Sequence, residues 1–292
     1  MKKLISLVFF VILICFICYG NSEQSFIIEI GNQSNQIGFT YENGEASGPV
    51  SICGFKDEIY ILDDGNLRVN VYSYQGTYKK SISIPKELGV YQDLTVNPQG
   101  EILLLTDNGI YRLGDKETEK IYDIPNSVST PYYIQADKFG NLIFNGLSKP
   151  GKKKGITSGI FSNNSSFNEL DGYIILTSFN GLIGLKQAKN VFLVLDHNKV
   201  INKLTLLSSK VLPIGLNDKK EIYCAEHTGK NYIFYKIDIN GKKITKEKNF
   251  ELNSALLGDE SINLRSFRVT WQGDIICLDV NKERCRVLIT RL

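Results

Sequence analysis

The sequence is poor in the residues that common enzyme mechanisms require. Its 292 residues include two His, one Trp and one Met. Histidine is the usual acid or base near neutral pH and a frequent zinc ligand, so two histidines leave most such mechanisms without a complete set of groups. The motifs Gly-x-Ser-x-Gly and His-Glu-x-x-His, the phosphate-binding loop and the dinucleotide-binding fingerprint are also missing. These absences exclude those particular mechanisms and no others.

An excess of charge of one sign is missing too. The formal net charge is +3, and it falls to +1 without residues 1–20, whose only charged residues are Lys2 and Lys3. A domain that binds nucleic acid is normally strongly basic, so we expect no nucleic-acid partner. The hydrophobic fraction of 42% in turn excludes an intrinsically disordered chain.

Cysteine is too sparse for a small disulfide scaffold, with six in the chain. Cys277 and Cys285 flank a predicted hairpin turn, and they face each other if paired residue numbers sum to 562, which would allow a disulfide. A register shifted by one residue separates them onto opposite faces of the sheet. Cysteine in a strand is more often a small buried apolar residue, so free cysteines are the preferred interpretation and a disulfide is the alternative.

The first twenty residues have the organisation of an export signal. A positively charged start precedes the uncharged apolar run Leu4–Cys18, and polar residues follow. This pattern predicts a secretory signal peptide over residues 1–20 of a bacterial type of chain. The alternatives are a lipoprotein signal acylated at Cys18 or Cys15, and a retained anchor, for which 15 apolar residues is short. We therefore expect an exported protein, periplasmic or extracellular.

The rest of the chain is rich in Tyr, Phe and Gly, with 15, 15 and 25 copies, which favours strands and turns. Six similar units each have an apolar run, a turn with Gly, Asn or Asp, and a second alternating run. Their turns fall near residues 57, 99, 139, 180, 218 and 272. Repeats of about forty residues with four short strands are typical of propeller blades. The sequence predicts one all-β domain over residues 21–292, a six-bladed β-propeller with four-stranded blades.

The last unit is one strand short. It supplies strands at 267–270, 274–278 and 285–290. Near the N-terminus, Ser25–Ile30 or Ile37–Tyr41 precedes the first unit without a partner there. Pairing of this N-terminal strand with the C-terminal blade would close the ring and remove an open sheet edge, so we predict that pairing.

One unit carries a more specific pattern, in which a tight turn joins the second strand to the third. The turn and the third strand after it contain Asp63, Gly65, Asn66, Arg68, Val69, Tyr72 and Gly76. This segment resembles the NHL repeat, which has Asp-x-Gly-Asn-x-Arg at that turn, an aromatic residue at the end of the third strand and a Gly turn. The second unit keeps Asp107-Asn108-Gly109, and the other units keep only the hydrophobic pattern and the turn residues. The resemblance implies the fold over residues 25–292 and says little about chemistry.

We expect a ligand on the face of the propeller that carries the turns between second and third strands and the connections between blades. The candidate binding residues on this face are Asp63, Asp64, Asn66, Arg68, Tyr91, Asp107, Asn108, Tyr132, Lys152, Lys153, Gln187, His227, Arg265 and Arg284. The basic loop Lys149–Lys154 is interpreted as a solvated insertion, with an anionic partner as the alternative.

Metal binding is not expected. Asp63, Asp64 and Asn66 place three oxygen-bearing side chains in one turn, but calcium takes six to eight oxygens, so a turn that caps backbone amides is the preferred interpretation and calcium the alternative. His197 and His227 fall at opposite ends of their strands in the predicted blades, which argues against a shared zinc site. We expect no cofactor and no catalytic residue.

These observations predict a monomeric, non-catalytic binding propeller that recognises a protein, peptide or glycan of the cell envelope. It would meet a membrane only through an N-terminal lipid or anchor. The alternative is a metal-dependent hydrolase or lyase, because sugar lactonases and amidating lyases have similar propellers and the lactonases hold a metal with Glu, Asn and Asp near the channel mouth. The two interpretations differ in whether such side chains converge at the central channel.

Overall fold

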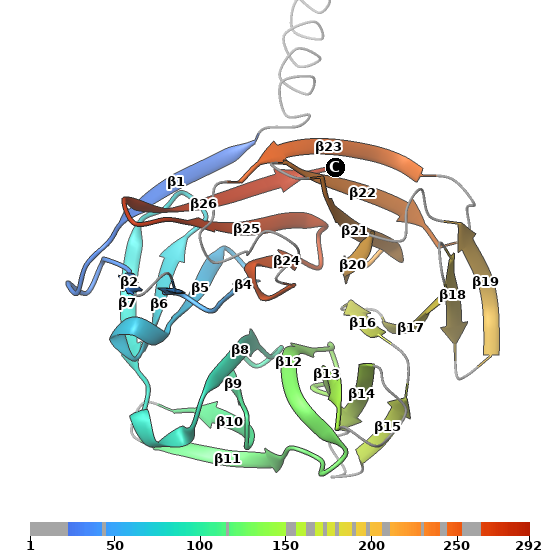
Figure 1. Ribbon diagram of the computed structural model, residues 1–292, viewed down its shortest axis with the longest axis horizontal. Coiled ribbons are helices and arrows are strands. Elements are labelled where there is room, and N and C mark those ends of the chain that lie inside the picture. Colours follow the sequence, from blue (N-terminus) through green and yellow to red (C-terminus); the bar gives the residue numbers. More distant parts are fainter. Residues whose placement is uncertain are drawn as a thin grey trace, which may run out of the picture.

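The protein folds into a ring of six four-stranded antiparallel sheets, the blades of an all-β propeller (Figure 1). The predicted fold class is therefore confirmed. This computed structural model describes residues 23–42, 45–114, 117–149, 156–161, 167–171, 174–178, 181–188, 191–196, 199–205, 211–228, 231–239, 244–252 and 264–292. The predicted signal peptide lies outside them. Within these ranges no helix is both long and apolar enough to cross a membrane.

Each blade runs from an inner strand to an outer strand. Blade 1 contains β4 (Ser51–Phe55), β5 (Glu58–Asp63), β6 (Arg68–Ser73) and β7 (Tyr78–Ser83). Blade 2 contains β8 (Tyr91–Val96), β9 (Ile102–Thr106), β10 (Gly109–Leu113) and β11 (Thr118–Asp123). Blade 3 contains β12 (Val128–Ala136), β13 (Leu142–Ser148), β14 (Ile156–Phe161) and β15 (Phe167–Asp171).

The second half of the ring has the same organisation. Blade 4 contains β16 (Ile174–Ser178), β17 (Gly181–Ala188), β18 (Val191–Asp196) and β19 (Lys199–Thr205). Blade 5 contains β20 (Leu212–Leu216), β21 (Glu221–His227), β22 (Asn231–Asp238) and β23 (Ile244–Glu251). Blade 6 contains β24 (Phe267–Val269), β25 (Asp274–Val280), β26 (Arg284–Arg291) and, as its outer strand, β1 (Gln24–Glu29).

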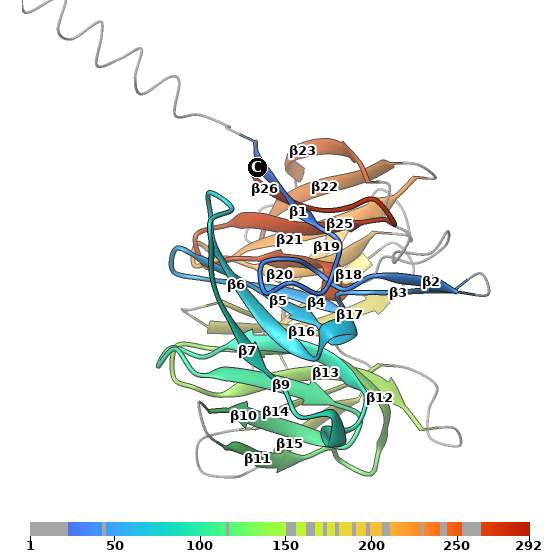
Figure 2. The same ribbon diagram turned by 90° about the vertical axis from the view of Figure 1, so that its left-hand side faces the viewer.

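Two faces of the ring follow from this order. The top face carries the turns between second and third strands and the connections from one blade to the next, and the bottom face carries the other turns. The connection from β1 to β4 contains a short hairpin of β2 (Thr40–Glu42) and β3 (Glu45–Ser47), which projects from the ring (Figure 2).

The ring is closed by the N-terminal strand, as predicted. In β1, Gln24 lies opposite Ile289 and Glu29 lies opposite Arg284 of β26. Of the two predicted segments, the structure therefore uses the first. Alternate side chains of β1 point inward and outward, so Ile28 is 3% exposed and Ile27 is 60% exposed.

Three of the turns between first and second strands have the same construction. In blades 2, 3 and 5 the side-chain oxygen of Asn97, Asp137 or Asn217 accepts the backbone N–H groups two and four residues further on, at 2.8–3.1 Å. In blades 2 and 3 the turn then needs a positive φ, which Gly100 (88°) and Gly140 (82°) supply. The predicted turns near 57, 99, 139, 218 and 272 are found, and the one near 180 lies outside the described residues.

The apolar core lies between neighbouring blades. Five clusters of buried residues each span two adjacent blades. Aromatic rings fill several of these interfaces: Phe267 of blade 6 lies 5.3 Å from Tyr232 and 5.4 Å from Phe234 of blade 5. Burial of these faces stabilises the ring because a single blade cannot cover its own two faces.

Cys277 and Cys285 are free and buried. Cys277 lies opposite Leu288, and Cys285 lies opposite Val280. This register directs the two sulfurs to opposite faces of blade 6, where Cys277 packs toward blade 5 and Cys285 toward blade 1. The structure therefore has the free cysteines and not the alternative disulfide.

Candidate functional site

A buried ion pair lies at the centre of the ring, where the inner strands meet. Arg268 of β24 donates to Asp93 of β8, and their side chains are 4% and 0% exposed. The other carboxylate oxygen of Asp93 accepts the hydroxyl of Ser51 in β4. The backbone N–H of Ile134 in β12 also donates to Asp93, at 2.7 Å. One carboxylate thus joins blades 1, 2, 3 and 6.

The guanidinium of Arg268 is also held by an aromatic ring. It lies 4.3 Å from the ring centroid of Tyr133, a cation–π contact, and the Tyr133 hydroxyl donates to Gln135 at 2.6 Å. Burial lowers the pKa of Arg268, and Asp93 together with Tyr133 and Cys53 raises it by more, so the pKa of Arg268 lies above its ordinary value. The group stays charged at any physiological pH.

Below this ion pair, toward the bottom face, the channel narrows to a cavity of about 20 Å³ lined by Cys53, Thr95, Gln135 and Arg268 among others. That volume is room for about one water molecule. Burial raises the pKa of the Cys53 thiol despite the nearby Arg268, so the sulfur is a thiol and not the thiolate that nucleophilic catalysis needs.

Arg265 lies above the ion pair, at the top-face end of the inner strands, a place that we call the mouth of the ring. It lies in the short helix η3 (Leu264–Ser266), which packs against β4 and β12. Its guanidinium donates to the carbonyl oxygen of Gln92 at 3.2 Å and to the side-chain oxygen of Gln92 at 3.0 Å. Burial lowers the pKa of Arg265, Asp93 raises it and Arg268 lowers it further, which shows that the three charges lie within electrostatic reach of one another.

The mouth therefore combines two guanidinium groups with one carboxylate. Tyr132 precedes Tyr133 in β12, and burial raises the pKa of its hydroxyl. We call the set Arg265, Arg268, Asp93 and Gln92 the mouth cluster. Its charges favour an approaching anion.

Three of the predicted binding residues instead hold the chain's own N-terminal loop. Asp63 is fully buried and accepts hydrogen bonds from Gly38 N–H, the Asn66 amide and Arg68, each at 2.9 Å. Asn66 donates in addition to the carbonyl of Gly31 at 2.9 Å.

Arg68 completes this arrangement. Its guanidinium donates to the carbonyl oxygens of Asn32, Gln33 and Gln36 at 3.3, 2.7 and 2.9 Å. The NHL-like turn thus fastens the loop that connects the closing strand β1 to blade 1. Its hydrogen-bonding capacity is largely used inside the protein.

Other predicted residues lie on the top face beside blade 2. Asp107 accepts the backbone N–H of Val90 at 3.1 Å, and Asn108 accepts the hydroxyl of Tyr111 at 2.8 Å. Tyr91 is 3% exposed and donates to the carbonyl of Pro85. Asp64 is half-buried, and burial followed by the neighbouring Asp63 raises its pKa. Of these residues, Asp107 and Asn108 are exposed enough for contact with a ligand.

The remaining candidates are spread around the ring. The ring of His227 stacks on Tyr232 at 4.7 Å, and Arg284 is exposed at the turn between β25 and β26. Gln187 lies near the end of β17. Lys152, Lys153 and His197 lie outside the described residues. Of these candidates, the structure places Arg265 beside the central ion pair.

The sequence did not point to Asp93, Arg268 or Ser51. Arg268 is the one polar residue of β24, and that contrast is a signal that was available; Asp93 shares β8 with Gln92 and Thr95, and Ser51 begins β4, so neither stands out in this way. The described ranges contain no group of three or more His, Cys, Asp or Glu that could hold a metal ion.

No known family description matches the sequence, and no curated protein matches it. Solved structures do match over most of the chain. Virginiamycin B lyase from Staphylococcus aureus has a TM-score of 0.55 at 14% identity, over 92% of this chain and 99% of that one. A gluconolactonase from Xanthomonas campestris has 0.52 at 9%, over 91% and 97%.

A third match is the calcium-binding protein regucalcin from Agrobacterium tumefaciens, with a TM-score of 0.52 at 11% identity, over 82% of this chain and 90% of that one. These identities are too low to transfer an activity. The comparisons establish that the chain is a six-bladed propeller of the kind shared by lyases, lactonases and calcium-binding proteins.

Proposed function

We propose that this protein is an exported, monomeric binding propeller, akin to NHL-repeat propellers, that recognises a peptide, protein or glycan through its top face. The ligand presents a carboxylate to the mouth cluster. One observation carries this: Arg265 brings a positive charge to the top-face end of the inner strands, above the buried Arg268–Asp93 pair, whose two charges offset each other.

The positions of these groups also favour binding over catalysis. Both oxygens of Asp93 accept hydrogen bonds from protein groups, which leaves this carboxylate engaged in holding blades together. The Cys53 thiol below it is protonated. Arg265 lies nearer the entrance, and guanidinium groups bind carboxylates with two parallel hydrogen bonds.

The proposal is tested by calorimetric titration with hexaglutamate and with an oligogalacturonate, each against a neutral counterpart. We expect at least one acidic probe to bind better than its neutral counterpart, and Arg265→Gln to weaken that binding by about tenfold. Arg291→Gln is the matched control, because Arg291 is exposed at the C-terminal end of β26 and pairs with Asp274 at 2.6 Å. Equal affinity of Arg265→Gln and the unchanged protein would refute the mouth as the binding site.

The alternative, a metal-dependent hydrolase or lyase, is supported by the shared fold alone. Titration with calcium and with magnesium separates the two functions. An unfolding temperature that rises with either ion at micromolar concentration would favour the enzyme, because a ligand of the native state stabilises it in proportion to its occupancy.

A further inference from the structure

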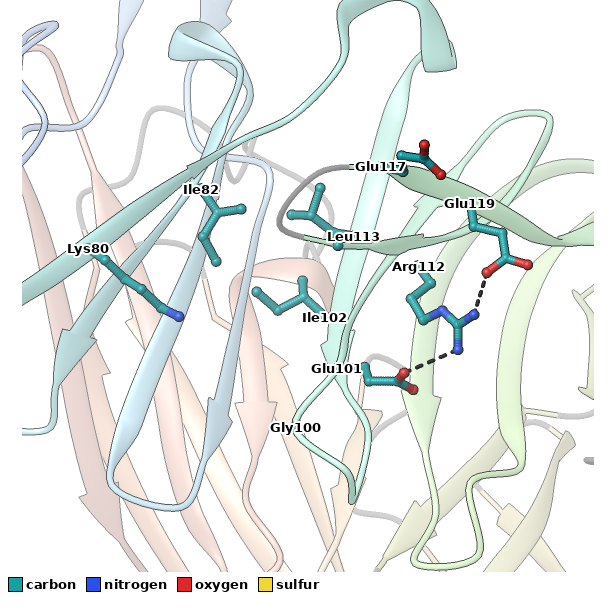
Figure 3. A pocket seen from close by; sticks show the side chains of 10 residues that line it. Lys80, Ile82, Gly100, Glu101, Ile102, Arg112, Leu113, Glu117 and Glu119 are labelled. Atoms are coloured by element: carbon teal, nitrogen blue, oxygen red, sulfur yellow. Dashed lines mark hydrogen bonds and ion pairs between the residues drawn. The ribbon is translucent and has the colours of Figure 1, made fainter.

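A second cavity, of about 660 Å³, lies on the bottom face between blades 1 and 2 (Figure 3). It is formed by β7 of blade 1 and by the turns and strands β9, β10 and β11 of blade 2. We call it the side groove. Its volume is in the range of pockets that hold a small molecule. It shares no residue with the mouth cluster and lies on the other face of the ring.

The groove has an apolar floor. Ile82, Ile102 and Leu113 gather in its middle, one from blade 1 and two from blade 2 (Figure 3). Ile102 and Leu113 are 5% and 8% exposed, so their side chains also belong to the core between the blades. A ligand with an apolar side chain would cover this floor and remove it from water.

The two sides of the groove carry opposite charge. Lys80 lies on one side, and Arg112, Glu117 and Glu119 lie on the other (Figure 3). Arg112 is engaged, since it pairs with Glu101 at 3.1 Å and with Glu119. In the described part of the chain, the side chains of Lys80 and Glu117 are exposed and make no hydrogen bond or ion pair, although each lines the groove. One ammonium and one carboxylate are thus available across an apolar floor.

From this arrangement we infer that the side groove binds a zwitterion, a short peptide with an apolar side chain. The peptide carboxylate lies at Lys80, its terminal ammonium at Glu117 and its side chain over Ile82, Ile102 and Leu113. A ligand of one charge sign fits less well, because an anion meets the glutamates and a cation meets Lys80. A single amino acid would leave much of the volume unfilled.

The probe is the tripeptide Ala-Leu-Ala with free ends, compared by calorimetric titration with its N-acetylated form and its C-amidated form. Loss of either terminal charge is expected to weaken binding by about fivefold, the effect of one exposed ion pair. Lys80→Met is expected to abolish the difference between the free and the amidated peptide only. Glu117→Gln is expected to abolish the difference between the free and the acetylated peptide only.

Lys79→Met is the matched control. Lys79 is the preceding residue of β7, and its ammonium bonds Glu58 at 2.9 Å, away from the groove. This variant should bind all three peptides as the unchanged protein does. Absence of binding at millimolar peptide, or equal affinity for the three peptides, would overturn the inference. The variants Lys80→Met and Glu117→Gln separate the side groove from the mouth cluster, because both leave Arg265 unchanged.

Discussion

Asp93 and Arg268 lie 175 residues apart in the chain and form a buried ion pair at the centre of the ring. The same carboxylate takes a hydroxyl from blade 1 and a backbone N–H from blade 3. A buried charge destabilises the folded protein when its partner is missing. The stability of the ring centre therefore depends on one residue from the first half of the chain and one from the second half.

Arg268→Met should therefore lower the free energy of unfolding by about 3–5 kcal/mol, because Asp93 is left buried without its guanidinium. Urea unfolding measures the loss. Combination with Asp93→Leu should recover part of it, since both charges are then gone. If the two single losses simply add in the double variant, the two residues do not act as a pair.

Arg68→Met should release the N-terminal loop. Arg68 makes three hydrogen bonds to carbonyls of that loop and one to Asp63, so we expect a loss of about 3 kcal/mol in unfolding free energy. Limited proteolysis should cut near residues 31–37 sooner than in the unchanged protein. Lys79→Met, which removes an exposed pair, should leave both measurements nearly unchanged.

Two neighbouring residues of the closing strand β1, Ile27 and Ile28, test the register of that strand. Ile28→Asp places a charge in the core between blades 6 and 1 and should cost about 4 kcal/mol. Ile27→Asp changes a side chain that is 60% exposed and should change stability by less than about 0.5 kcal/mol. Thermal unfolding measures both, and equal effects would contradict the observed strand register. Deletion of residues 25–41 should abolish cooperative unfolding altogether.

The raised pKa of Asp64 predicts that the stability of the folded protein depends on pH. Burial, and then Asp63, raises its pKa, so its ionised form destabilises the folded protein above the ordinary carboxyl pKa of about 3.9. Asp64→Asn should raise the unfolding temperature at pH 7, and the gain should vanish near pH 3, where the carboxyl is neutral in both states.

Glu58 provides the opposite case. The hydrogen bond from Tyr60, at 2.6 Å, lowers the pKa of Glu58 more than burial raises it, and Lys79 adds to the lowering. Its contribution is present above the ordinary value of about 4.3 and is lost as the pH falls through its lower folded value. Glu58→Gln should therefore lower the unfolding temperature at pH 7 and have little effect near pH 3. Effects of the same sign for both variants would contradict the assignment.

The blade turns and the closing strand could be predicted because their signals are local and repeated. Asn97, Asp137 and Asn217 each begin the turn between the first and second strands of their blade. The alternation of apolar and polar residues indicates the strand β1. The pairing of Asp93 with Arg268 could not be predicted. The two residues are 175 positions apart in the sequence, and they meet only because the closed ring brings β8 and β24 to its centre. The register of Cys277 and Cys285 depended on the turn between β25 and β26, where one residue more or less reverses the answer.

The turn between β5 and β6 shows that a sequence motif does not reveal which partner its side chains contact. The tight turn that its residues predict is present, as the short helix η1 (Asp64–Asn66) between β5 and β6. The structure adds that Asp63, Asn66 and Arg68 face a loop of the same chain, a partner that is distant in sequence and offers them backbone carbonyls and the N–H of Gly38. The residues that form the mouth cluster come from η3 and from strand interiors. At such positions a sequence pattern indicates that a residue is buried and does not indicate its function.

The pairing of Gln24 with Ile289 has a consequence for biosynthesis. Of the described strands, β1 is synthesised first, and its partner β26 is synthesised last. A growing chain can build blades 1 to 5 in order, but β1 remains a loose end until β26 is available. Ring closure is thus a late, whole-chain event, and a chain stalled before β26 keeps an exposed strand that proteases and chaperones can recognise.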